Sequence, residues 1–232
     1  MTIFAAEVID LINTHLDEAI GLRSEFMEKT DGSYVSKGDL LISELVKNYF
    51  TRHFPTHIFV SEEDFDQNME KDSNSSYVFV DPIDGTENFV SGLKEWGVGV
   101  SVYTSGEHEE SLIYLPELKD FHYTGSECQI YKSRIIGLSS SISYHELPEQ
   151  RYENHEIRIV GCAMYNLLSA ARGSFSYFEN IKGVNCWDIL PGLNIALELG
   201  CDVYVNGKRY TGEILFPGEK FKVRVEQKHG RR

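Results

Sequence analysis

The chain has 232 residues, of which 22 are basic and 36 acidic, so its formal net charge is −14. Such a surface repels phosphate backbones and anionic lipid headgroups, which argues against a nucleic-acid or membrane partner. With 41% hydrophobic and 25% charged residues, the composition is that of a chain that buries a core. We expect one compact unit, or two closely packed lobes over about residues 1–140 and 155–232.

No apolar stretch approaches the roughly 18 residues that a membrane-spanning helix needs. The N-terminus alternates acidic and apolar residues, unlike the basic and then apolar pattern of an export signal. These patterns predict a cytoplasmic protein. Its four cysteines form no CxxC pair, so we expect reduced core thiols at Cys128, Cys162, Cys186 and Cys201.

The N-terminal third shows helical periodicity followed by short strand-like runs. Apolar residues recur at every fourth position from Phe4 to Ile20, which predicts an amphipathic helix over residues 2–28. A second helix is expected over about 38–50, because Pro55 excludes its continuation. β-branched and aromatic runs predict buried strands at 58–60 and 77–80, separated by a polar loop at 62–76.

The middle of the chain favours antiparallel strands, and the last third alternates strands and helices. Valine alternates with Gly and Ser over 96–103, and we expect a meander of short strands from there to about residue 131. The polar segment 139–154 has neither period, which is typical of an irregular crossover between lobes. The elements expected after it are a strand at 157–160, a helix at 162–171, a strand at 174–178, a helix at 187–199, and a strand at 202–205 with a hairpin turn at Asn206-Gly207.

Two carboxylates stand directly after the strand at 77–80. Asp81 follows the strand, and Asp84 comes after Pro82, which stiffens the turn between them. Two carboxylates approach closely only if a proton or a cation relieves their repulsion, and at neutral pH Mg²⁺ is the usual cation. The alternative is that these are ordinary turn residues whose side chains cap Asp-Pro and Asp-Gly turns.

A second acidic strand end strengthens the metal interpretation, because it and the Asp81–Asp84 pair gain weight jointly. Glu62, Glu63 and Asp64 follow the strand at 58–60 and form a second acidic strand end, although a solvated acidic loop would look alike. Asp188 lies in the first turn of a predicted helix, where the helix dipole alone could account for an acidic residue.

Four short motifs resemble those of the inositol monophosphatase family, in the same order. Residues 81–89, Asp-Pro-Ile-Asp-Gly-Thr-Glu-Asn-Phe, resemble its Asp-Pro-Ile/Leu-Asp-Gly-Thr-x-Asn-Phe signature. Residues 33–39 resemble its Asp-Leu-Val-Thr-x-x-Asp block, with Ser33 in place of the first Asp. Residues 60–63 resemble Ile-Gly-Glu-Glu, and residues 187–192 resemble Trp-Asp-x-Ala-Ala-Gly. The similarity reaches from about residue 1 to residue 210.

The resemblance implies a single α/β domain over residues 1–232, layered as an α-β-α-β-α sandwich, with Mg²⁺ as its cofactor. It also implies a role for each matched position. The implied metal ligands are Glu62, Asp81, the Ile83 carbonyl, Asp84 and Asp188; the implied catalytic residues are Asp39 and Thr86, which activate water, and Glu63 beside a third metal; the implied substrate contacts are Gly85, Thr86, Gly161, Cys162, Ala163 and Glu179.

The function implied is a Mg²⁺-dependent phosphomonoesterase that hydrolyses a small polyol or sugar phosphate, such as inositol monophosphate. The acids at positions 81 and 84 are three residues apart, and not in the Asp-x-Asp pattern that supplies an aspartyl nucleophile, which favours attack by water. Phosphatases of 3′-phosphoadenosine-5′-phosphate, fructose 1,6-bisphosphate or histidinol phosphate share the metal motifs and remain alternatives. A non-catalytic binding or regulatory module of the same fold is the alternative from another class. A small phosphate ester is the expected partner, and the resemblance allows a homodimer.

Overall fold

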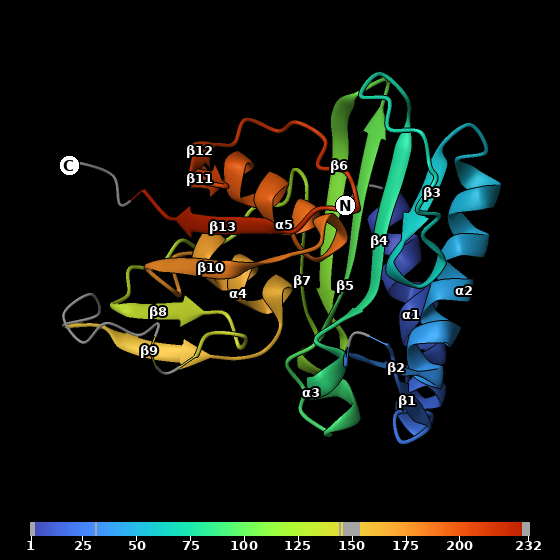
Figure 1. The fold of residues 1–232 in the computed structure, drawn as a ribbon, viewed down its shortest axis with the longest axis horizontal. Helices are drawn as coiled ribbons and strands as arrows, with labels where there is room; N and C mark the ends of the chain where they lie inside the picture. The colour runs from blue at the N-terminus through green and yellow to red at the C-terminus, as the bar shows by residue number, and fades with distance from the viewer. Residues whose placement is uncertain (1–2, 31, 144, 146–153, 229–232) are drawn as a thin grey trace.

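The computed structural model describes residues 3–30, 32–143, 145 and 154–228, and Figure 1 shows their arrangement. Their regular elements in chain order are α1 Ile3–Gly21, β1 Phe26–Glu28, β2 Tyr34–Ser36, α2 Lys37–His53, β3 Ile58–Ser61, η1 Glu62–Asp64, β4 Tyr77–Asp84, α3 Thr86–Val90, β5 Gly97–Thr104, β6 Glu107–Leu115, η2 Pro116–Leu118, β7 Asp120–Tyr123, β8 Ile135–Leu138, β9 Glu156–Ile159, α4 Ala163–Ala171, β10 Tyr177–Val184, α5 Cys186–Glu198, β11 Asp202–Val205, β12 Lys208–Arg209 and β13 Phe221–Glu226.

The first helix is shorter than its apolar pattern suggested. Phe4, Val8 and Ile12 are buried as expected, but α1 ends at Gly21, so the prediction of a helix to residue 28 is wrong. The four-residue apolar period stops at Ile20, and Gly is a poor helix former. Residues 26–28 instead form β1, which pairs antiparallel with β2 in a small hairpin.

The five-stranded sheet carries the first core and the expected meander. Its strand order is β3-β4-β5-β6-β7, with β3 parallel to β4 and the remaining pairs antiparallel. Helices α1 and α2 pack on one face of it (Figure 1). β4 faces both ways, because Val78 and Val80 contact this α1–α2 core while Tyr77 and Phe79 belong to a second core around α4 and α5.

The alternation of valine with small residues in β5 has a packing reason. Its valines fill the α1–α2 core, and its glycines face α4 and α5. A Cβ on Gly99 would lie 2.1 Å from Cε of Met164 and 3.0 Å from Cγ of Pro191. The small side chains of β5 therefore let the two inner helices approach the sheet closely.

The second sheet has six strands in the order β12-β11-β13-β10-β8-β9. It contains the predicted hairpin of β11 and β12 and two strands that the sequence did not indicate, β8 and β13. The strand expected at 174–178 occurs as β10, displaced to Tyr177–Val184. It passes through a bulge between Asn180 and Val184 in its pairing with β13.

The layers follow the order helices, sheet, helices, sheet (Figure 1). α4 and α5 lie between the two sheets and contact both. The mixed α/β fold class is therefore confirmed, whereas no helix covers the outer face of the six-stranded sheet within the described ranges.

Most of the crossover expected over 139–154 lies outside the described residues. None of the helices in this part of the chain combines the length and apolarity that a membrane span requires.

Candidate active site

Three carboxylates from distant parts of the chain meet at one edge of the five-stranded sheet. β3 and β4 are parallel, and Ser61 pairs with Val80, so Glu62 and Asp81 continue side by side from adjacent strand ends. Asp188 reaches the same place from the first turn of α5. Oxygen atoms of Glu62, Asp81 and Asp188 all lie within 4.8 Å of one another.

Asp81 is the least satisfied of these acids. It is 1% exposed, and neither carboxylate oxygen has a hydrogen-bond partner in the described chain. Burial raises the pKa of Asp81 well above its usual range, and the charges of Glu62, Asp188 and Asp84 raise it further. Burial similarly raises the pKa of Asp188, with the Asn185 amide and the charge of Lys220 opposing the rise. A divalent cation would satisfy these oxygens, so the donor set fits a metal.

Asp84 is anchored by the N-terminus of α4. Its Oδ2 accepts hydrogen bonds from the backbone N–H of Met164 and from Sγ of Cys162, the latter at 3.0 Å. Burial raises the pKa of Asp84 to about 6, although these two donors oppose the rise. Asp84 lines a cavity of about 250 Å³ together with the three clustered acids and Ile83, so all four predicted acidic ligands face one space.

The two residues expected to activate water are in direct contact. Oγ1 of Thr86 lies 3.1 Å from Oδ1 of Asp39 and 3.0 Å from the Ile83 carbonyl. Asp39 is 1% exposed, and its Oδ2 accepts from the backbone N–H and the hydroxyl of Ser36 in the capping box of α2. Burial raises the pKa of Asp39 against these hydrogen bonds. These hydrogen bonds hold the Asp39 carboxylate in one orientation.

Gly85 and Gly161 bring two backbone segments together at the cavity wall. Gly85 has φ +86°, and a Cβ there would lie 3.1 Å from Cβ of Cys162 and 3.3 Å from the carbonyl oxygen of Gly161. Asn88 links the backbone at Glu95 with the backbone before Gly161, since its Nδ2 donates hydrogen bonds to the carbonyls of Glu95 and Val160 at 2.7 Å each. A smaller cavity of about 90 Å³ continues past Gly161, Cys162 and Ala163 and shares Asp84 and Asp188 with the first.

Lys29 is a member of the site that sequence reasoning missed. Its Nζ lies 2.9 Å from Oε1 of Glu62 and 3.0 Å from Oε1 of Glu63. Burial alone would lower the pKa of Lys29, but the two carboxylates outweigh it and raise the pKa. Glu63 is therefore held beside the cluster by an ion pair. A lone lysine in a short polar segment gave no signal, because its partners lie more than thirty residues away.

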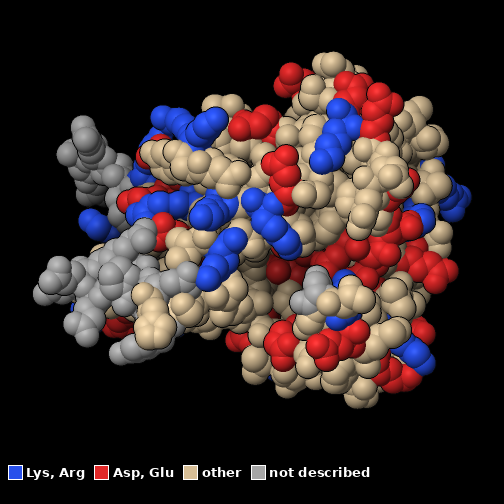
Figure 2. Space-filling model, viewed as in Figure 1, with Lys and Arg blue, Asp and Glu red and all other residues tan. Residues whose placement is uncertain are grey.

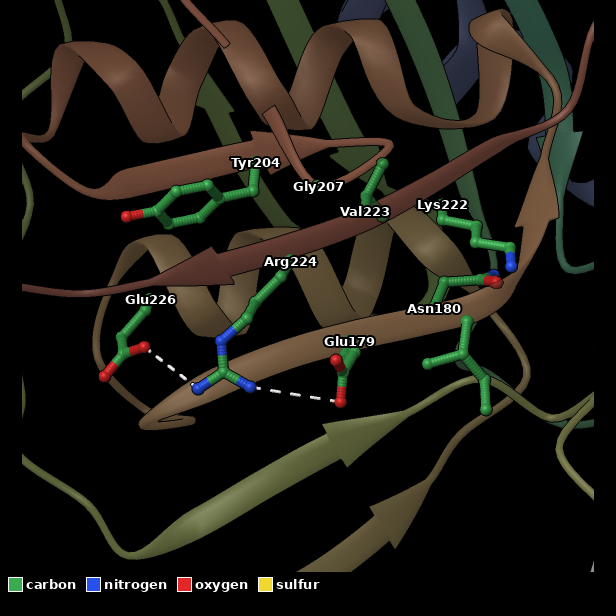
Figure 3. A pocket seen from close by; sticks show the side chains of 9 residues that line it. Glu179, Asn180, Tyr204, Gly207, Lys222, Val223, Arg224 and Glu226 are labelled. Carbon is green, nitrogen blue, oxygen red and sulfur yellow. Dashed lines mark hydrogen bonds and ion pairs between the residues drawn. The ribbon is translucent and has the colours of Figure 1, made fainter. Parts of the chain in front are cut away.

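Glu179 is the predicted site residue whose side chain lies apart from the others. It lines a groove of about 490 Å³ on the outer face of the six-stranded sheet and does not line the cavities at the metal cluster (Figure 3). Its neighbours Phe178 and Asn180 line the small cavity beside Asp84 and Asp188. Successive side chains of a strand point to opposite faces, which separates Glu179 from Phe178, whereas Asn180 at the start of the bulge lines both spaces.

Comparisons with known proteins agree with the fold and the site. The model of the inositol monophosphatase family matches residues 2–224. A fructose-1,6-bisphosphatase/inositol-1-monophosphatase of Aquifex aeolicus is 25% identical over 83% of this chain and 80% of its own length. The 3′(2′),5′-bisphosphate nucleotidase CysQ of Salmonella typhimurium is 25% identical over 87% of this chain and 89% of its own length.

A solved structure supports the same fold. The crystal structure of an IMPase/NADP phosphatase complexed with Mg²⁺ and phosphate superposes with a TM-score of 0.81 at 18% sequence identity, covering 96% of this chain and 88% of that one. The resemblance of the four sequence motifs is thus confirmed over nearly the whole chain. The protein belongs to the inositol monophosphatase family, whose members are phosphatases, and it is a phosphoric monoester hydrolase.

Proposed function

We propose that the protein hydrolyses a small polyol or sugar phosphate with Mg²⁺ as cofactor and water as nucleophile. The observation that carries the proposal is the Asp81 carboxylate, which is buried, has no hydrogen-bond partner in the described chain, and has an oxygen within 4.8 Å of oxygens of Glu62 and Asp188. Mg²⁺ held there would lower the pKa of a water molecule and stabilise negative charge on the phosphate oxygens. Glu62, Asp81, Asp84, Asp188 and the Ile83 carbonyl would hold the metal.

The surrounding residues have distinct roles in this proposal. Thr86 donates its hydroxyl proton to Asp39, so its lone pairs can accept a hydrogen bond from the attacking water. The proton that the water releases passes to the Thr86 hydroxyl as this hydroxyl gives its own proton to Asp39. The backbone amides of Gly85 and Thr86, at the start of α3, would bind phosphate oxygens, because the first amides of a helix have no intrahelical acceptors. Gly161, Cys162 and Ala163 would face the alcohol part of the ester.

A phosphate-release assay tests the proposal with a matched pair of variants. The protein should release phosphate from inositol monophosphate or a related monoester with Mg²⁺ and not with chelator, and Asp81→Asn should reduce kcat by about a thousandfold or more. Asp64→Asn is the control, because Asp64 is exposed and pairs with Lys47 away from the cavity. Activity of Asp81→Asn within tenfold of the parent at saturating Mg²⁺ would reject the metal assignment.

A further inference from the structure

A row of basic residues lies along β13 and leads toward the acidic site. Phe221, Val223 and Val225 are buried, so Lys222 and Arg224 occupy the outer face, and Lys220 precedes the strand in the same alternation. Residues two apart on a strand lie about 6.6 Å apart along it. Figure 2 shows basic side chains gathered beside the red acidic cleft. In a chain of net charge −14, this local excess of positive charge is a distinct feature.

The cation furthest from the site is neutralised, whereas the two nearer ones are not. Arg224 pairs with Glu226 at 3.0 Å and Glu179 at 3.9 Å, and its guanidinium lies 3.9 Å from the ring centre of Tyr177 (Figure 3). Lys220 and Lys222 are exposed, and no residue in the described part of the chain accepts a hydrogen bond from either ammonium. Their charges are free to bind an anion.

The bulge in β10 sets Lys220 beside the metal cluster. Asn180 Oδ1 accepts from the backbone N–H of Lys182 at 3.0 Å and of Gly183 at 2.8 Å, which holds the bulge in shape. Gly183 has φ +99°, and a Cβ there would lie 2.9 Å from Cβ of Lys220. The chain then enters α5, which carries Asp188, and the charge of Lys220 acts on that carboxylate.

Shared lining residues connect the cavity at the metal cluster with the groove that Lys222 lines. The cavity of about 250 Å³ shares Asp84, Gly161 and Asp188 with the smaller one of about 90 Å³. The smaller one shares Asn180 with the outer groove, where Lys222 lies next to Asn180 (Figure 3). A substrate whose scissile phosphate binds the metal cluster would extend along β10 toward Lys222 in the groove and Lys220 beside the bulge.

We infer that Lys220 and Lys222 bind a second phosphate group of the substrate, so that the preferred substrates are small molecules carrying two phosphates. The inference rests on the proposed phosphatase function and concerns the part of the substrate that does not react. A second phosphate would otherwise approach a strongly acidic surface, and two unpaired ammonium groups compensate for that repulsion. Because both lysines are exposed, salt should weaken the preference.

Matched substrate pairs test the inference by kinetics. The pairs are fructose 1-phosphate with fructose 1,6-bisphosphate, and adenosine 3′-phosphate with adenosine 3′,5′-bisphosphate. In at least one pair the bisphosphate should have the higher kcat/KM, and Lys220→Gln/Lys222→Gln should reduce the ratio of the two kcat/KM values at least tenfold, chiefly through KM. Lys208→Gln is the control, since Lys208 pairs with the buried Val205 and so faces the other side of the sheet. It should leave the ratio unchanged.

A binding measurement separates failure of this inference from failure of the proposed function. Adenosine 3′,5′-bisphosphate and fructose 1,6-bisphosphate are titrated calorimetrically, with Mg²⁺, into Asp39→Asn protein with and without the two lysine substitutions. Binding weakened at least tenfold by the substitutions supports the subsite even if no ester is hydrolysed. Equal binding with and without the lysines, no binding of either bisphosphate, or a monophosphate preference in both kinetic pairs overturns it, while hydrolysis of a monophosphate would leave the phosphatase proposal standing.

Discussion

The hydroxyl of Thr86 and the carboxylate of Asp39 form the most closely defined pair in the site. The hydroxyl has one proton and two acceptors in reach, Asp39 Oδ1 at 3.1 Å and the Ile83 carbonyl at 3.0 Å. Either donation leaves the lone pairs of this oxygen able to accept a hydrogen bond, and Thr86 lines the same cavity as the acids. The pair can thus orient a water molecule. Because Thr86 carries no charge, its hydroxyl contributes no charge to the binding of a metal.

This geometry predicts a selective loss in the Thr86→Ala variant. We expect kcat to fall about a hundredfold while the Mg²⁺ dissociation constant changes less than about threefold, because a proton-transfer partner is lost and no metal ligand is. Thr86→Ser keeps the hydroxyl and should recover most of the rate. Steady-state kinetics and a Mg²⁺ titration measure both quantities.

The double variant tests whether the two residues act together. Asp39→Asn should resemble Thr86→Ala, and the combination should be little slower than either single variant, since both remove one function. Losses that multiply would show that the two residues act independently, and the shared role in activating water would then be wrong.

The local sequence could predict which acids belong to the candidate metal site, because they follow the ends of recognisable strands. Asp81 and Asp84 follow an apolar run, and Glu62 follows the parallel strand next to it. Lys29 and the thiol of Cys162 could not be predicted in this way. Each acts through a partner that is distant in sequence and is set by the packing of β1–β2 or α4.

At the scale of elements, the close contact of α4 with α5 depends on a missing side chain. Gly192 of α5 faces Leu167 of α4, and a Cβ at Gly192 would lie 2.6 Å from Cβ of Leu167. Both atoms would be attached to helix backbones, so relief requires the helices to separate. These helices supply Asp188 and the donors to Asp84, which couples the packing to the site.

We therefore expect Gly192→Ala to destabilise the fold by about 1–3 kcal/mol, the usual range for overpacking a tight core. Gly21→Ala is the control: Gly21 ends α1, is exposed, and has nothing within 4 Å of its added Cβ. It should be neutral or slightly stabilising. Urea unfolding of both variants measures the difference, and equal midpoints would contradict the packing argument.

The elements that sequence could predict are those with a strong local pattern. The apolar period defined α1 and α2, and the valine alternation defined β5. β13 alternates apolar with charged residues, which is a strand pattern, although no strand was expected in this C-terminal segment. β1 is exposed along its length and exists because β2 pairs with it, so its own residues gave no signal. The division into a single domain with two lobes stays a prediction.

At the scale of the whole molecule, buried acids make stability depend on pH and metal together. In the absence of metal, burial raises the pKa of Asp84 from its ordinary 3.8 to about 6, and it raises the pKa values of Asp81 and Asp188 well above their usual range. The native state then binds protons more tightly than the unfolded chain. The stabilisation from Asp84 is complete below about pH 4 and is lost as the pH rises through about 6.

The melting temperature in chelator should therefore fall between about pH 5 and about pH 7, opposite to the trend of a protein stabilised by ionised carboxylates. Mg²⁺ replaces the protons, so its stabilising effect should grow over the same interval. At a hundredfold excess over its Kd we expect about 2.7 kcal/mol, or a rise of about 5–10 °C. Differential scanning fluorimetry across pH, with and without Mg²⁺, measures this. A rise in melting temperature with pH in chelator would contradict it.

β4 also has a consequence for the kinetics of unfolding. Because alternate residues of this one strand belong to the α1–α2 core and the α4–α5 core, neither core can open without disturbing the strand that completes the other. Partial opening of one half should therefore be as rare as global unfolding. The acids around the site come together only when both cores have formed and packed against each other. A bound cation should therefore slow unfolding and hardly change the rate of folding. The metal-bound enzyme should accordingly have a long native lifetime.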